Sequence, residues 1–92
     1  MSNAEFRKWF HENLVKGEEN HEKGIYNYTL GDYSFTTKPT KSGHLSLYAN
    51  GKVCATRIYD NDFAVYDSIY VYLSHLACSN QLVGGRQEAR SI

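Results

Sequence analysis

The chain has 92 residues, with ten basic and ten acidic side chains and a formal net charge of zero. A mimic of DNA would be strongly acidic and a nonspecific duplex-DNA binder strongly basic, so the charge balance argues against both classes and leaves only a local basic patch open. The size predicts one domain with one modest core, because so small a domain buries only about 60% of the surface that its unfolded chain exposes. The sequence contains no apolar run of the roughly 20 residues that span a membrane and no apolar signal segment at its N-terminus, so we expect a cytoplasmic protein.

The N-terminal segment predicts an amphipathic helix over 2–16. Ser2 and Glu5 have the S-x-x-E spacing of a capping box, in which each side chain accepts a hydrogen bond from the other residue's backbone N–H. An apolar stripe recurs at every fourth residue, at Phe6, Phe10 and Leu14. Gly17 follows as the expected C-terminal cap, and the charged run 18–24 is interpreted as a solvated linker.

After the charged run the apolar period changes to two, which is typical of strands. Four strands are predicted, over 25–30, 33–37, 44–49 and 52–59. Gly31-Asp32 and Asn50-Gly51 each fit a two-residue hairpin turn, and Asn-Gly suits a type I′ turn because both central residues need positive φ. The loop between the second and third strands contains Pro39, the single proline of the chain, which we expect to end the second strand.

A regular two-residue turn sets the register of the last hairpin. It places Leu47 opposite Cys54, and Leu45 opposite Thr56. The two leucines and Cys54 then share the predicted core face. The other face of this hairpin carries His44, Ser46, Tyr48 and Arg57. A single bulge would reverse the two faces, because successive strand residues point in opposite directions.

The Asp-Asn-Asp segment at 60–62 is expected to end the fourth strand and to cap a second helix. An apolar stripe at helical spacing supports this helix over 66–78, and its members are Ile69, Tyr72, Leu73 and Leu76. The expected fold class is therefore α+β, with an N-terminal helix, a four-stranded antiparallel meander and a C-terminal helix, both helices lying on one face of the sheet. Residues 1–80 are expected to form a single domain and 81–92 a flexible tail.

The sequence shows no motif for catalysis, metal binding or phosphate binding. A calcium loop that starts at Asp60 needs glycine at its sixth position and glutamate at its twelfth, where this chain has Val65 and Val71. Cys54 and Cys78 form no C-x-x-C pair, and they are interpreted as reduced thiols. The spacing of the four histidines indicates no nucleophile–His–acid set. We therefore expect a protein that has no enzymatic activity and binds no cofactor or metal.

The aromatic content is the most informative feature of the composition. With 8 Tyr, 4 Phe and 1 Trp, the chain has more aromatic surface than so small a core can hide, and Tyr is a favoured contact residue. Basic residues lie among these rings around the third and fourth strands. The predicted partner-binding residues are Tyr28, Tyr33, Lys38, Lys41, His44, Tyr48, Lys52, Arg57 and Tyr59. The alternative interpretation is an ordinary structural role, because Tyr is a good strand former and Lys is common in loops.

The hairpin Leu45–Tyr59 around Asn50-Gly51, its flanking lysines and the amphipathic terminal helices resemble the small phage-encoded anti-CRISPR proteins that act on type I RNA-guided surveillance complexes. The resemblance covers most of the chain and is one of size and composition. It implies an inhibitor in the bacterial cytoplasm that occupies a host protein or ribonucleoprotein complex, with Cas proteins and guide RNA as partners. Such an inhibitor would block binding of target DNA by occlusion.

Two other functions are compatible with the same residues. A small RNA- or single-stranded nucleic-acid-binding module would use the lysines for phosphates and the tyrosines for stacking on bases. An accessory homo-oligomeric structural protein would instead pair with copies of itself, which a net charge of zero does not oppose.

Overall fold

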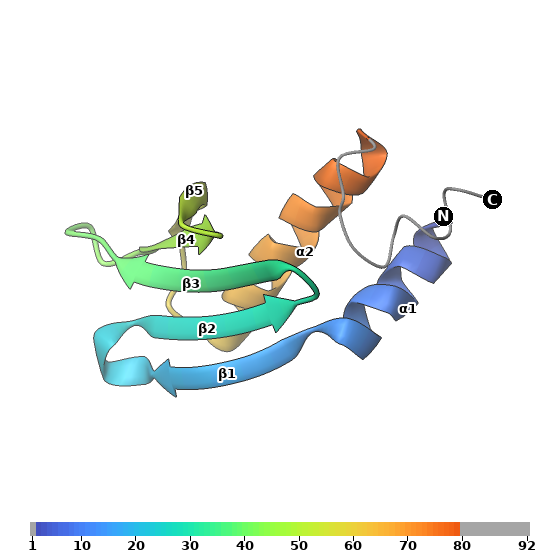
Figure 1. The fold of residues 1–92 in the computed structure, drawn as a ribbon. Helices are drawn as coiled ribbons and strands as arrows, with labels where there is room; N and C mark the ends of the chain where they lie inside the picture. Colours follow the sequence, from blue (N-terminus) through green and yellow to red (C-terminus); the bar gives the residue numbers. More distant parts are fainter. Residues whose placement is uncertain (1, 80–92) are drawn as a thin grey trace.

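The structure, a computed structural model, describes residues 2–79 of the chain (Figure 1). In chain order its elements are α1 (Asn3–Asn13), β1 (Val15–Asn20), the 3-10 turn η1 (His21–Lys23), β2 (Ile25–Leu30), β3 (Tyr33–Pro39), β4 (Leu45–Ala49), β5 (Lys52–Ile58) and α2 (Asp62–Cys78). The strands form one antiparallel sheet in the order β1-β2-β3-β4-β5. The α+β class is confirmed, with five strands in place of the predicted four. The predicted tail 81–92 lies outside the described residues.

The additional strand, β1, comes from the segment that was predicted as the end of a helix and a linker. α1 begins at the predicted capping box: the Ser2 hydroxyl accepts a bond from the Glu5 N–H at 3.1 Å, and the Glu5 carboxylate accepts one from the Ser2 N–H at 2.8 Å. The helix ends at Asn13, and Leu14 is already extended, so the predicted cap at Gly17 is wrong. Pairing with β2 satisfies the backbone groups on the inner side of β1, and this hairpin contact overrides the local charge pattern.

The core lies between one face of the sheet and α2. Side chains in β2, β3 and β4 alternate, and those on the covered face are Tyr26, Tyr28, Leu30, Tyr33, Phe35, Thr37, Leu45, Leu47 and Ala49. Val65, Ile69 and Leu73 of α2 are fully buried against them. α2 begins earlier than the apolar stripe predicted, at Asp62, because the Asn61 side chain caps it by accepting a bond from the Ala64 N–H at 2.8 Å.

α1 contacts the rest of the core by packing against α2. Figure 1 shows α1 continuing from β1 at the end of the sheet. The Phe10 ring packs edge-on against Tyr66 and Tyr70 of α2, with ring centres 5.1 and 5.0 Å apart. Phe6 contacts Tyr70 in the same way at 5.3 Å. Both helices were predicted to lie on one face of the sheet. The structure shows this for α2, whereas α1 packs on α2 through aromatic rings.

The register of β5 differs from the predicted one. Leu47 pairs with Ala55 instead of Cys54, and Leu45 pairs with Ile58, two residues beyond its predicted partner. Each of the two register shifts adds one residue to β5, so together they restore the alternation that a single bulge would have reversed. The leucines therefore stay in the core as predicted, and Ile58 joins them.

Backbone conformation explains how the last hairpin turns and bends. Asn50 and Gly51 have φ of 50° and 88°, so the predicted type I′ turn is confirmed. Arg57, at the second bulge, has φ of 59°, which is uncommon for a residue other than glycine. β3 runs on to Pro39, which pairs with Leu45 as its last residue, so the proline ends the strand two residues later than predicted.

Neither helix in the described part of the chain is long and apolar enough to cross a membrane.

The packing predicts that Phe10 and Phe63 contribute very differently to the free energy of unfolding. We expect Phe10→Ala to lower the free energy of unfolding by about 3–5 kcal/mol, because Phe10 is 0% exposed and its removal leaves a cavity. Phe63→Ala is the matched control: its side chain is 79% exposed, and the expected change is within about 0.5 kcal/mol. Urea denaturation followed by circular dichroism measures both, and equal losses would contradict the described packing of α1.

Candidate functional site

The sheet has a second face, which no element in the described range covers. Its accessible side chains, here called the open face, are Val15, Asn27, Thr29, Ser34, Thr36, Lys38, Tyr48 and Val53, and the buried Ser46 points to the same side. Strand pairing sets Asn27, Thr36, Tyr48 and Val53 in one row across β2 to β5. The Lys38 ammonium lies 4.9 Å from the centre of the Tyr48 ring, within the range of a cation–π contact.

Two of the predicted partner-binding tyrosines lie on the covered face instead. Tyr28 and Tyr33 are only 4% and 7% exposed and belong to the core. Burial, with the charge of Asp62, raises the pKa of Tyr28. The sequence contained the signal for this placement, because Tyr28 alternates in step with Leu30 and both side chains therefore point to one face. These tyrosines do not share a surface with Lys38 and Tyr48.

The remaining predicted residues fall into separate groups. His44 and Tyr59 meet at the end of the sheet, with ring centres 5.6 Å apart. His44 also pairs through Nδ1 with the Ser42 hydroxyl at 3.2 Å, in the loop that carries exposed Lys41. Exposed Lys52 begins β5 beside the Asn-Gly turn, and exposed Arg57 lies at the bulge. The nine residues therefore do not form one continuous surface, and Lys38 with Tyr48 is the pair that shares the open face.

Both edges of the sheet are irregular. β1 carries a register shift between Lys16 and Glu19, and β5 carries two. Edge bulges and edge charges oppose the addition of another strand, because they interrupt the row of free backbone groups that a new strand would need. A partner of this sheet is therefore better accommodated on its open face than along its edges.

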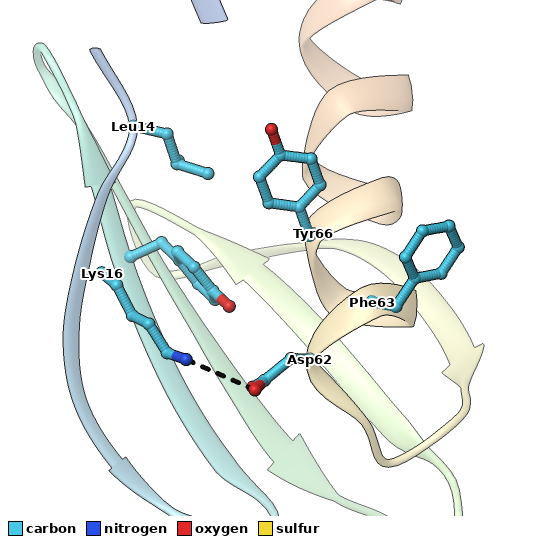
Figure 2. A pocket seen from close by; sticks show the side chains of 6 residues that line it. Leu14, Lys16, Asp62, Phe63 and Tyr66 are labelled. Carbon is cyan, nitrogen blue, oxygen red and sulfur yellow. Dashed lines mark hydrogen bonds and ion pairs between the residues drawn. The ribbon is translucent and has the colours of Figure 1, made fainter. Parts of the chain in front are cut away.

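A cleft lies between β1 and the first turns of α2 (Figure 2). Its volume is about 420 Å³, and it is lined by Leu14, Lys16, Tyr28, Asp62, Phe63 and Tyr66. The Lys16 ammonium lies 3.3 Å from Asp62 Oδ2 and 3.1 Å from Glu19 Oε2. Of the lining residues, Tyr28 alone was predicted from the sequence to contact a partner, because one wall of the cleft is β1, which was predicted as helix and linker.

Three side chains that could coordinate a metal ion lie close together at the end of this cleft. One ligand atom each from Glu19, His21 and Asp62 lie within 4.8 Å of one another. The Lys16 ammonium already bridges the two carboxylates, and His21 Nε2 is 2.9 Å from Glu19 Oε1. These donors are therefore engaged with groups of the chain itself, and the arrangement does not require a metal ion. Beside them, the Tyr26 hydroxyl donates to Asp60 at 2.7 Å, and burial together with this bond raises the pKa of Tyr26.

A second groove brings Cys54 and His75 to one surface, together with Asp67. The groove has a volume of about 340 Å³ and lies between β5 and α2. Burial raises the pKa of the Cys54 thiol from its ordinary value of 9.0 to about 11. A cysteine nucleophile needs the opposite shift, because the thiolate is the reactive form. The raised pKa therefore does not favour Cys54 as a nucleophile.

Comparisons with protein families, with curated proteins and with solved structures found no match to this chain.

The raised pKa of Cys54 predicts that its thiol reacts slowly with disulfide reagents. With Cys78 replaced by serine, we expect Cys54 to react with a disulfide reagent at pH 8 about 100-fold more slowly than a thiol of ordinary pKa, because two pKa units reduce the thiolate fraction by that factor. The rate should rise steeply up to about pH 11. The matched control is Cys54→Ser, which leaves the exposed Cys78. A fast reaction of Cys54 at neutral pH would contradict the burial and reopen the possibility of catalysis.

Proposed function

We propose that the protein is a non-enzymatic binding protein that attaches to a protein or ribonucleoprotein complex through the open face. The observation that carries this proposal is the uncovered sheet face with the Lys38–Tyr48 pair near its centre. Tyr supplies large contact area with few rotamers to lose, and the lysine already packed over the ring reduces the ordering cost of binding.

The composition of the open face supports a macromolecular partner. Val15 and Val53, at the two sides of the sheet, are 60% and 56% exposed. Val15 pairs with Thr29, and Val53 pairs with Tyr48, so both valines point to the open face. The positions between them are Asn, Ser and Thr residues, which make adaptable hydrogen bonds. The open face therefore combines an aromatic ring, two exposed valines and polar side chains, and protein interfaces contain such mixtures.

Protein contact is favoured over base stacking by the placement of the tyrosines. A single-strand binding surface uses several exposed rings on which successive bases stack. On the open face the described residues include one ring, Tyr48, because Tyr28 and Tyr33 lie in the core. Lys38 already lies against that ring. We therefore favour a protein or ribonucleoprotein over free nucleic acid as the partner.

The proposal extends to the role of an inhibitor in the bacterial cytoplasm. A small neutral chain that resembles type I anti-CRISPR proteins in size and composition suits stoichiometric occlusion of a surveillance complex. The open face would cover the complex where target DNA enters. Cas protein and guide RNA would then be contacted together, through Tyr48 and Lys38.

Binding to a purified type I surveillance complex tests this proposal. We expect 1:1 binding that survives nuclease, and an affinity at least about tenfold lower for the double variant Lys38→Glu with Tyr48→Ala, because both changes remove the centre of the interface. The matched control is Lys8→Glu, a charge reversal at an exposed position on α1. Surface plasmon resonance measures the affinities, and circular dichroism checks the fold.

Two outcomes would contradict the proposal. Equal affinities of the double variant and the Lys8→Glu control would remove the open face as the site. Binding only to bare oligonucleotides, with an affinity that falls steeply as salt rises, would replace the proposal with the nucleic-acid module.

A further inference from the structure

We propose that the cleft between β1 and α2 is a second binding site, which takes an apolar side chain of a protein partner flanked by a lysine or arginine. The evidence for this site is independent of the open face. The cleft has about 420 Å³ and mostly apolar walls, formed by Leu14, Tyr28, Phe63 and Tyr66. That volume is in the range of sites that hold small ligands or anchoring side chains.

Phe63 forms part of one wall of the cleft, and exposure of its apolar ring to water is unfavourable. Phe63 lies in the first turn of α2 and is almost fully exposed, although it adjoins an apolar cleft. Figure 2 shows Leu14 and Tyr66 facing each other across the cleft, with Phe63 on the outer side of the helix. An exposed aromatic ring beside an apolar cleft is typical of an interaction site.

The charges at the rim select the flanking residue of the partner. Two carboxylates, of Glu19 and Asp62, lie around one ammonium, that of Lys16. Asp62 Oδ2 is paired with Lys16, whereas Asp62 Oδ1 has no hydrogen-bond partner within the described range. A small outward rotation of the carboxylate would present Oδ1 to an incoming cation. The excess of negative charge therefore favours a lysine or arginine next to the apolar anchor.

Peptide titrations followed by NMR test the site. The probes are N-acetyl-Phe-Lys-amide and its charge-reversed match, N-acetyl-Phe-Glu-amide, each added to the full ¹⁵N-labelled chain. We expect saturable shifts of the amides of Leu14, Lys16 and residues 62–66, with an affinity for the Phe-Lys peptide about threefold to fivefold higher than for the Phe-Glu peptide, as a partly exposed ion pair provides. Asp62→Asn should abolish this difference, and Phe63→Ala should weaken the binding of both peptides.

The control for Phe63→Ala is Val71→Ala, which removes a partly exposed apolar side chain from the same helix away from the cleft. This variant should bind like the unaltered chain. The proposal is overturned by the absence of saturable shifts at the cleft, or by equal affinities of the two peptides for the unaltered chain. Shifts at the cleft that grow with protein concentration, without peptide, would show that the occupant is a second copy of this chain and would equally overturn the assignment.

Discussion

The coverage of one sheet face by one helix is the constraint on which the rest of the structure depends. α2 buries Val65, Ile69 and Leu73 on one side of a five-stranded sheet, and α1 packs on α2 through its aromatic rings. A chain of this size has no further element in its described part to cover the other side. The buried tyrosines and the open face both follow from this division, because alternation sends every second strand residue to each face.

The binding surfaces that we propose arise from the same division. The open face contains Lys38 and Tyr48 on the side away from α2. The cleft lies on the covered side, where β1 extends past the area that α2 fills and leaves Tyr66 and Phe63 accessible. Because the sheet separates the two surfaces, occupation of one leaves the other free. Bulged edges direct binding to these surfaces by opposing the growth of the sheet.

The candidate sites could be predicted from the sequence only in part. Lys38 and Tyr48 were selected because basic and aromatic residues gather around one hairpin, and the structure places them in contact. Tyr28 was selected by the same composition argument, although its alternation with Leu30 indicated a core position. The cleft was missed because the charged residues of β1 carry no strand pattern, so the hairpin that β1 forms with β2 was not predicted.

The sequence by itself determined the features that depend on neighbouring residues. The capping box at Ser2 and Glu5, the strand alternation and the Asn50-Gly51 turn were all predicted and are present, because each is stabilised by bonds or backbone preferences within a few residues. Only the tertiary structure decided the fifth strand, the two bulges of β5 and the face of the sheet that α2 covers. These depend on which strand offers backbone partners and on how the helix packs, and such gains in free energy exist only once the chain has folded.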